Sequence, residues 1–386
     1  MLTYKTAGES HGKGVAALID GFPANAPLDS EFIDRELRRR QGGYGRGGRQ
    51  AIERDSVEIL TGVLHNRSMG SPILLWVKNK DYKLESMPEL TRPRPGHGDL
   101  SGSIKYGSGI RPILERSSAR ETTGRVAAGA LARLLLRELG VEVAGYVTRI
   151  GSVELPPDES TLSQSPESIR ATRDSSSVYS LRPDLDKQAE QAIDEAQKDG
   201  DTLGGIIETR VFNVPFGLGQ HAQWSEKLDG RIARAVAAIQ AIKGLEIGDG
   251  FQLASIPGSR AHDEILWNES SRYERNLGFV RPTNRAGGLE AGMTNGQPIV
   301  VRAAMKPIPT LRKPLRSVDL KTKEAVEAAF ERSDACAVSA ASVVMENVIA
   351  FEIAAAVVDK FGGDSLEEIQ ARIELFQNTT AKRLDN

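Results

Sequence analysis

The chain has 386 residues, of which 39% are hydrophobic and 26% charged, and its formal net charge is −2 at pH 7. These values are those of an ordinary globular protein, and the small net charge gives no overall bias toward nucleic acid or a membrane surface. Cys336 is the one cysteine of the sequence and cannot form an internal disulfide. The first residues lack the pattern of a signal peptide and no run of about 18 apolar residues follows, so we expect a cytoplasmic protein.

Hydrophobic periodicity and turn signals predict the elements in chain order. The first half predicts strands over 2–7 and 15–19, a helix over 31–40, a strand over 51–60, a helix over 121–139 and a strand over 141–150. The second half predicts a Ser- and Pro-rich surface segment over 151–180, helices over 184–198 and 225–243, strands over 203–214 and 297–305, a long apolar helix over 334–360 and a polar helix from 365.

Local signals support several of these boundaries. Asp29 or Ser30 can cap the first helix, whose arginine-rich end suits the negative pole of the helix dipole. Asp20-Gly21 is a hairpin-like turn signal after the second strand. Strands and helices are mixed and no linker stands out. We therefore expect one large domain over residues 1–386, of the α/β class in its α+β form, with two sheets and helices between or around them.

Two short motifs match known patterns in the wrong context. Gly8-Glu9-Ser10-His11-Gly12 fits the G-x-S-x-G nucleophile elbow, but the seven residues before it are too few for the strands that this elbow needs. The glycines at 43–48 fit G-x-G-x-x-G, yet they follow a helix and lead into a strand, the reverse of a dinucleotide-binding turn. We interpret these glycines as allowing the backbone to come close to a ligand.

Arginine is concentrated in two places. The first set is Arg38, Arg39, Arg40, Arg46 and Arg49, and the second is Arg92, Arg94, Arg111, Arg116 and Arg120. Because arginine binds carboxylate and phosphate bidentately and keeps its charge, both sets fit a small ligand with several negative charges. The alternative is a solvated basic face, which is the commoner explanation for arginine runs.

Two histidines, His11 and His97, stand in glycine-rich loops near these arginines. Histidine titrates near neutral pH, so both are candidates for acid–base catalysis. A structural histidine with satisfied hydrogen bonds is the alternative for each. The spacing of the histidines and of the single cysteine matches no metal site, and we expect no metal.

Three separated segments together resemble the chorismate synthase family. They are GESHG (8–12) running to DGFP (20–23), ERSSARET (115–122), and RSDAC (332–336) continuing to MEN (345–347). Between them lie RRRQGGYGRGGR (38–49), RPRPGHGD (92–99), DGDTLGG (199–205), AGMTNG (291–296) and MKPIPTL (305–311). Each segment alone is weak, but their order across nearly the whole chain makes the resemblance specific.

The resemblance implies a fold, an activity and partners. Family members are homotetramers, and each subunit is a sandwich of two sheets with helices between them. They are lyases of the shikimate pathway, which supplies aromatic amino acid biosynthesis. They catalyse a 1,4-anti elimination of phosphate from 5-enolpyruvylshikimate 3-phosphate to give chorismate. The reaction requires reduced FMN although it has no net redox change. The expected partner is thus a small phosphorylated substrate, and neither nucleic acid nor a membrane is expected.

The resemblance also assigns residues. The catalytic residues it implies are His11 near the leaving phosphate, His97 near the flavin and Asp334 near flavin N5. The substrate-binding residues it implies are Ser10, Arg40, Arg46, Arg49 and Arg120. The FMN-binding residues it implies are Arg116, Ser117, Ser118, Gln240, Ala241, Ala291, Lys306, Pro307, Ile308, Pro309, Thr310 and Arg332.

The sequence departs from the family at two of these positions, since Gln240 replaces a common Asn and Ala291 a common Gly. Arg40 and Arg46 also match positions sometimes assigned to NADP, so NADPH is a possible reductant. Two other hypotheses remain open from the sequence. One is a serine hydrolase that uses Ser10, and the other is a non-catalytic protein that binds a phosphorylated metabolite or polyphosphate.

Overall fold

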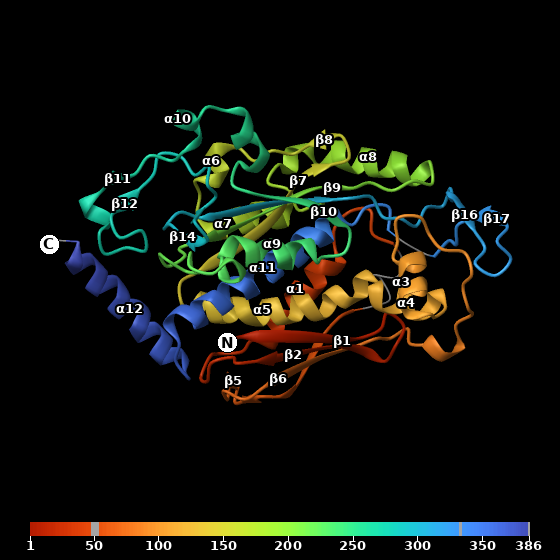
Figure 1. The fold of residues 1–386 in the computed structure, drawn as a ribbon, viewed down its shortest axis with the longest axis horizontal. Coiled ribbons are helices and arrows are strands. Elements are labelled where there is room, and N and C mark those ends of the chain that lie inside the picture. The colour runs from red at the N-terminus through yellow and green to blue at the C-terminus, as the bar shows by residue number, and fades with distance from the viewer. Residues whose placement is uncertain (48–53, 332–333, 385–386) are drawn as a thin grey trace.

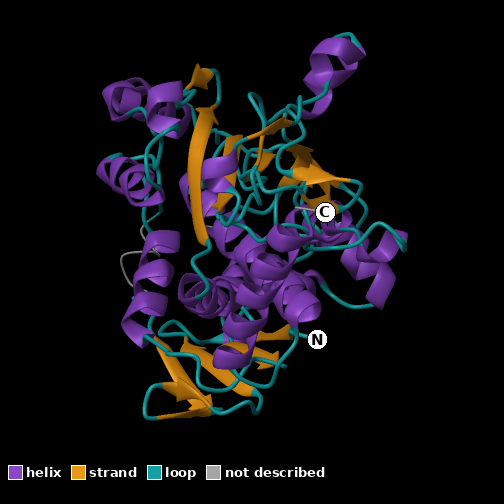
Figure 2. Ribbon diagram, turned by 90° about the vertical axis from the view of Figure 1, so that its left-hand side faces the viewer, coloured by secondary structure: helices purple, strands orange, loops and turns teal. Residues whose placement is uncertain are grey.

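Two antiparallel sheets enclose a layer of helices in this computed structural model, which describes residues 1–47, 54–331 and 334–384. Figure 2 shows the two sheets at opposite ends of the view with the helices between them. The predicted α+β class and the sandwich of two sheets around helices are therefore confirmed. This layering follows from the apolar faces of both sheets, each of which must be covered by another element.

The first sheet is built from the N-terminal part of the chain in the order β1-β2-β6-β3. Its strands are β1 (Thr3–Gly8), β2 (Gly14–Asp20), β6 (Ile73–Lys78) and β3 (Val57–Thr61). The hairpin between β1 and β2 turns through residues 9–13, and after Gly21 the chain leaves the sheet, so β2 pairs next with β6. Asp20-Gly21 thus ends a strand without forming the hairpin that the sequence suggested. The short strands β4 (Val63–Leu64) and β5 (Arg67–Ser68) pair beside this sheet.

The second sheet has the order β10-β15-β9-β7-β8. Its strands are β10 (Ile242–Ile247), β15 (Ile299–Met305), β9 (Gly205–Phe212), β7 (Glu142–Ile150) and β8 (Val153–Glu154). The predicted strands over 141–150, 203–214 and 297–305 correspond to its three central members. Their inward-facing side chains, such as Ile207 and Val301, are fully buried against the helices.

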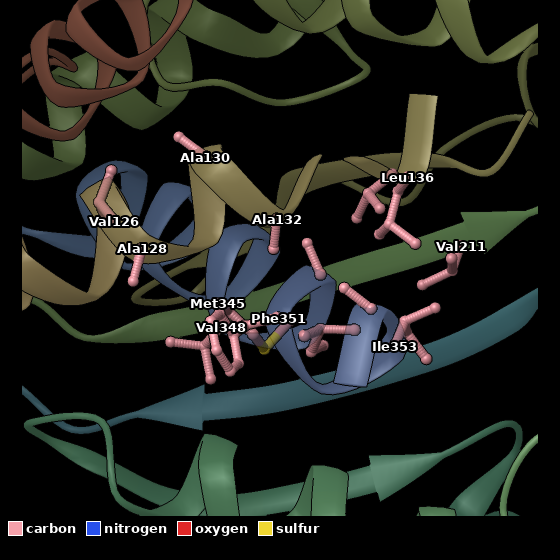
Figure 3. Packing of buried hydrophobic residues seen from close by; sticks show 14 of the residues in the cluster. Val126, Ala128, Ala130, Ala132, Leu136, Val211, Met345, Val348, Phe351 and Ile353 are labelled. Carbon is pink, nitrogen blue, oxygen red and sulfur yellow. The ribbon is translucent and has the colours of Figure 1, made fainter. Parts of the chain in front are cut away.

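Helices α1 (Ser30–Gln41), α5 (Thr122–Glu138), α9 (Leu228–Ala237) and α11 (Val338–Phe361) form the middle layer. Helix α5 lies against the first sheet and α11 against the second, and the two helices pack on each other. Figure 3 shows the side chains between them, among them Val126, Ala128, Met345 and Phe351. Small residues of α5 let the two helices approach closely, because there is little side-chain volume between their backbones.

Gly129 marks the closest approach of α5 and α11. A Cβ at this position would lie 2.6 Å from the Cβ of Asn347 and still closer to the Asn347 carbonyl oxygen. We expect Gly129→Ala to lower the free energy of unfolding by about 1–3 kcal/mol, the usual effect of overpacking a core. Chemical denaturation measures this change.

The control is Gly230→Ala on α9, where the nearest atom to the new Cβ is the Trp224 carbonyl oxygen at 3.8 Å. There the better helix propensity of alanine should raise stability by up to about 1 kcal/mol. Equal effects at the two positions would contradict the close approach as the cause.

The segment 151–180 is more ordered than its composition predicted. It contains α6 (Glu159–Leu162) and α7 (Pro166–Ser175), and α7 packs on the outer face of the second sheet against β7. Ser165 caps α7, and Ile169 and Arg173 are buried beneath it. The Ser and Pro residues that suggested a loop thus serve as the cap and first residue of a helix.

Two predicted helices have different limits. The helix expected over 225–243 ends at Ala237, and Ala241, at φ +67°, turns the chain into strand β10. The helix expected over 334–360 begins at Val338, so Asp334 lies in the loop before it. The helix predicted over 184–198 corresponds to α8 (Asp186–Lys198) and the C-terminal helix to α12 (Leu366–Arg383). The strand predicted over 51–60 fits only in its second half, because β3 begins at Val57 and residues 51–53 lie outside the described residues.

Shorter elements occupy the two ends of the molecule (Figure 1). One end carries α3 (Asp99–Tyr106), α4 (Ile110–Ser117), β16 (Arg316–Val318) and β17 (Ala325–Glu327). The other carries α10 (Gly258–Ala261), β11 (Leu266–Trp267), β12 (Phe279–Val280), β13 (Leu289–Glu290) and β14 (Met293–Thr294). Single 3-10 turns complete the described chain: η1 (Leu84–Ser86), η2 (Ala119–Glu121), η3 (Pro183–Leu185), η4 (Trp224–Glu226), η5 (Gly250–Ser255) and η6 (Glu269–Ser271).

Within the described residues, α11 is the one helix whose length and composition would allow it to cross a membrane. Nearly all of it is buried between α5 and the second sheet. The same apolar composition is what a central core helix requires.

Candidate active site

The predicted site residues converge mainly at the end of the molecule that carries α3 and α4. They come from the β1–β2 turn, the end of α1, the loop before α3, the α4–η2 junction and the loops that follow β15 and precede α11. Direct contacts join these loops, since the Ser10 amide donates to the Glu115 carbonyl oxygen at 3.0 Å and Lys306 Nζ to the Gly96 carbonyl oxygen at 2.8 Å. The site is therefore assembled from both sheets and from the helices between them.

Asn79 shapes the turn that carries Ser10 and His11. Its side-chain amide donates to the carbonyl oxygens of Glu9, Ser10 and Gly12 at 2.8–3.3 Å. Ser10 is buried, and its hydroxyl accepts a hydrogen bond from Ser118 at 3.2 Å. The predicted substrate ligand Ser10 and the predicted flavin ligand Ser118 are thus direct neighbours.

This geometry does not support a serine hydrolase. The motif around Ser10 forms a turn between two antiparallel strands, whereas a nucleophile elbow joins a strand to a helix. The Nδ1 of His11 lies against the Glu115 carboxylate.

Glu115 holds His11 at two points. One carboxylate accepts the His11 amide at 2.8 Å and lies 3.0 and 3.1 Å from its Nδ1. Burial alone would raise the pKa of Glu115, but the hydrogen bonds from His11 and the charges of His11 and Arg111 outweigh it and lower that pKa. Glu115 is therefore an anion that only accepts hydrogen bonds.

Arg40 and Arg120 share the buried carboxylate of Asp55. Each guanidinium lies 2.7 Å from an Asp55 oxygen, and Arg120 Nε also donates to Asn79 at 2.8 Å. Two cations on one anion leave an excess positive charge. Burial is the largest effect on Arg40 and lowers its pKa to about 10, with Asp55 opposing it, so Arg40 stays charged at neutral pH.

This pair can still bind an anion. Among the described residues, Arg120 Nη2 and Arg40 Nε have no hydrogen-bond partner although both are buried. Buried donors normally have partners, and these two atoms are accounted for if a ligand supplies the acceptors. Of all the predicted substrate residues, these two arginines fit a phosphorylated or carboxylated ligand best.

Arg46 and Asp334 are brought together as an ion pair. Arg46 Nη1 lies 2.5 Å from Asp334, and the Gly47 amide donates to the same carboxylate at 2.6 Å. The Gly45 carbonyl oxygen accepts from the amides of Ala335 and Cys336, which fixes the loop before α11. Arg49 and Arg332, which the resemblance assigned to substrate and flavin, lie outside the described residues.

The glycines at 43 and 45 have a different role from the one expected. Both have positive φ, and a Cβ on Gly45 would lie 2.7 Å from Ile193 and 3.1 Å from Cys336. A Cβ on Gly43 would collide with Ser339 in α11. At these two positions the close approach is to the protein itself rather than to a ligand.

His97 lies in a second cluster of charges. Its Nδ1 is 2.5 Å from Asp99, which also binds Arg94 Nε at 2.8 Å, and Arg94 Nη1 donates to Thr310 at 3.0 Å. Burial alone would raise the pKa of Asp99, but hydrogen bonds from His97 and Arg94 outweigh it and hold the pKa well below its usual range. Arg94 therefore ties the His97 loop to the predicted flavin loop at 306–310.

Most of the predicted flavin residues border this region. Arg116 binds the Gly8 and Thr6 carbonyl oxygens, and Ser117 binds the Ile113 carbonyl oxygen. The Ala241 carbonyl oxygen accepts from the Lys306 amide at 2.9 Å, and the Ile308 carbonyl oxygen from Thr202 at 2.8 Å. Pro307 and Pro309 lie on the same loop.

Two features of these residues fit a bound flavin phosphate. Gln240 donates to Glu121 at 3.1 Å, while its buried amide oxygen has no partner among the described residues. The pKa of Lys306 is lowered, first by burial and then by the charge of Lys243 nearby. The amide oxygen of Gln240 can accept a hydrogen bond from a polar ring edge. The two neighbouring lysines can bind an anionic tail.

Ala291 lies on a different element from these residues. It lies at φ +51° in the hairpin between β13 and β14, whose Gly292 carbonyl oxygen accepts from the Leu228 amide at the start of α9. Gln240 follows the other end of that helix. Ten helical residues separate the two ends, and this corresponds to about 15 Å.

Sequence reasoning missed the carboxylates and the amide that hold the site together: Asp55, Asn79, Asp99 and Glu115. Asp99 stands two residues after His97 and could have been noticed. Asp55 and Glu115 had no local signal, because their partners are far away in the sequence. Within the described residues, no group of three or more His, Cys, Asp or Glu could hold a metal ion.

A two-sheet α+β fold that gathers arginines and histidines in loops at one end has the charge and the acid–base groups to bind a small anion. A family model described as chorismate synthase matches residues 2–358. The chain belongs to the chorismate synthase family, as the resemblance implied.

Individual relatives agree with this assignment. The chorismate synthase of Listeria welshimeri is 50% identical over 394 residues, which cover 98% of this chain and 99% of the relative. That of Shouchella clausii is 52% identical over 390 residues, which cover 97% and 98%. A solved structure described as the crystal structure of chorismate synthase has a TM-score of 0.81 and 41% identity, and covers 99% of this chain and 98% of its own.

Proposed function

We propose that this protein is a chorismate synthase that eliminates phosphate from 5-enolpyruvylshikimate 3-phosphate with reduced FMN as its cofactor. The observation that carries the proposal is the buried Arg40–Asp55–Arg120 group, with two guanidinium N–H groups free of partners among the described residues. It has excess positive charge and is linked through Asn79 to the Ser10–His11 turn. Membership in the family supplies the reaction.

The residues of the chain have separate tasks in this proposal. Arg40 and Arg120 bind the anionic groups of the substrate, and Arg46 assists them from the glycine-rich loop. Ser10 donates a hydrogen bond to the phosphate, and His11 donates the proton that the leaving phosphate takes up. Asp334, oriented by Arg46 and Gly47, is the carboxylate that we assign to the proton leaving C6.

When bound, reduced FMN supplies electron density to the substrate as its allylic phosphate leaves. Gln240, Ala241 and the loop at 306–310 would hold the flavin, with Lys306 near its anionic tail. His97 would face the flavin from the loop that Arg94 fixes. Ala291 lies on the hairpin at the opposite end of α9 from Gln240, and its assignment to the flavin stays a prediction.

The decisive assay is anaerobic and uses purified protein, the proposed substrate and FMN kept reduced by dithionite. Phosphate release and chorismate absorbance are followed together, and we expect both to increase in step. An aerobic arm with FMN and NADPH tests whether the enzyme reduces its own flavin. Ligand-dependent stabilisation without any product in either arm would instead favour a non-catalytic anion-binding protein.

We further propose a homotetramer in the cytoplasm. The outer face of the first sheet exposes 44% of Leu18 and 53% of Leu60, and no described element lies against it in Figure 1. These leucines lie there among exposed charged residues such as Lys5 and Glu58, and an interface between subunits would cover them. Light scattering coupled to size-exclusion chromatography should give four times the 41.8 kDa chain mass, and a monomer would refute the tetramer.

A further inference from the structure

Both site histidines are held in the same way, by a buried carboxylate on Nδ1 that is itself paired with an arginine. For His11 the carboxylate is Glu115 at 3.0 Å, and Arg111 Nη1 lies 3.5 Å from it. For His97 the carboxylate is Asp99 at 2.5 Å, paired with Arg94. The two groups come from different parts of the chain, so the repeated arrangement does not result from one local motif.

The contacts of Glu115 determine which nitrogen of His11 can react. An ionised carboxylate only accepts hydrogen bonds, so the Nδ1 that faces it must carry a hydrogen. The remaining nitrogen, Nε2, is then the one that gains and loses a proton. The amide of His11 is bound by the same carboxylate, which fixes the main chain as well as the ring.

We propose that Glu115 is a positioning residue that keeps the hydrogen of His11 on Nδ1 and balances the imidazolium charge, so that Nε2 alone delivers the proton to the leaving phosphate. Before transfer the pair is His11 as imidazolium with Glu115 as carboxylate, and its net charge is zero. The Nε2–H bond breaks as an O–H bond forms on the phosphate, and the pair becomes singly negative. This inference rests on the proposed function, whereas the pairing itself can be tested without it.

Other charged groups also face His11. Arg111 connects Glu115 to Glu331, which is 3.5 Å from Arg111 Nη2. On the other side, the amides of Lys83 and Leu84 donate to the His11 carbonyl oxygen, and the side chain of Lys83 is paired with Asp81. Glu115 is the one described carboxylate in contact with the ring, so its charge should dominate the protonation of His11.

The first test needs neither flavin nor substrate. Diethyl pyrocarbonate modifies neutral imidazole, and peptide mass spectrometry gives the rate at each histidine as a function of pH. In Glu115→Gln the imidazolium loses its counter-charge, so half-maximal modification of His11 should move to lower pH. The exposed His262 in the same sample is the internal reference and should not move.

The second test is kinetic. In the anaerobic assay, Glu115→Gln should lower kcat about 10- to 100-fold, less than the full effect of losing a general acid. KM should change little, because Glu115 does not touch the substrate. Glu115→Asp keeps the charge and should recover part of kcat, and it also replaces the Gln variant if that variant fails to fold. Glu138→Gln, an exposed change of the same charge on α5, should behave as wild type.

These results separate the possible failures. An unchanged His11 modification curve, or an Asp variant that behaves like the Gln variant, would overturn the role of Glu115. A wild-type protein without lyase activity but with the expected modification curves would refute the proposed function and leave the pairing intact. A fall in thermal stability with no change in pH dependence would mean that Glu115 only supports the fold.

Discussion

Replacing His11 with alanine should lower kcat about 10²- to 10⁴-fold, the usual contribution of a positioned general acid. In the proposed reaction the leaving phosphate needs a proton, and we assign its supply to the His11 imidazole, which Glu115 holds on the turn that also carries Ser10. KM should change much less, because in our proposal Arg40 and Arg120 provide the charge that binds the substrate. The measurement is kcat and KM in the anaerobic assay with reduced FMN.

The fold should tolerate this change. The His11 side chain is mostly covered and its ring binds Glu115, and that carboxylate keeps the His11 amide and Arg111 as partners after the change. The thermal midpoint should therefore stay close to that of wild type. His262→Ala, at an exposed position far from the site, is the matched control. If His11→Ala kept the wild-type rate, another group would have to donate the proton, and His97→Ala would be tested next.

Local signals predicted much of the fold. Asp29 or Ser30 was expected to cap the first helix, and it is the Asp29 side chain that accepts from the Phe32 amide. The predicted strands of the second sheet have the right places because each is apolar and bounded by turn residues. The failures occurred where local patterns were ambiguous. Residues 225–243 have helical periodicity throughout. The chain nevertheless turns from helix to strand at Ala241, which has a positive φ. An alanine in the sequence does not indicate such a turn.

The start of α11 shows a second kind of failure. Asp334 precedes the apolar run and resembles a helix cap. Its carboxylate instead binds Arg46 and the Gly47 amide, 287 residues earlier in the chain. A tertiary contact thus overrides a local preference, and no window of sequence contains both partners.

The candidate site was only partly predictable from the sequence. Arginines and histidines in glycine-rich loops indicate anion binding and acid–base chemistry from their residue type alone. What orients them was not predictable, since Glu115 reaches His11 across 104 positions. Composition also could not tell that Arg39 belongs to the core while its neighbour Arg40 belongs to the site. That division follows from which side of α1 each residue occupies.

Arg39 belongs to a buried cluster of five charges between the helices. Its members are Glu36 and Arg39 of α1, Arg133 of α5, Arg173 of α7 and Glu346 of α11. Glu346 binds Arg39 at 2.9 Å, Arg133 at 3.0 Å and Arg173 at 3.3 Å, and it is fully buried. One carboxylate thus connects three arginines on three elements.

Glu346→Gln should lower the free energy of unfolding by about 3–5 kcal/mol at neutral pH, as expected when one member of a buried ion pair is removed. The three arginines would then keep Glu36 and the half-exposed Asp174 as counter-charges, which do not balance the desolvation of three buried cations. Chemical denaturation at pH 7 measures the loss. Glu374→Gln, an exposed change of the same kind on α12, should alter stability by less than about 0.5 kcal/mol.

The pH dependence of the stability loss tests whether the charge of Glu346 is its cause. Burial alone would raise the pKa of Glu346, but Arg133, Arg39 and Arg173 outweigh it and lower that pKa below its unfolded value. A lowered folded pKa adds stability above the unfolded carboxyl pKa of about 4.3, and this stability is lost as the pH falls toward the folded pKa. The difference between wild type and Glu346→Gln should therefore be largest near neutral pH and shrink below about pH 4. A difference that stays constant down to acid pH would mean that the lost charge is not the cause. The loss would then have to come from packing at the end of α1, next to Arg40 and the substrate site.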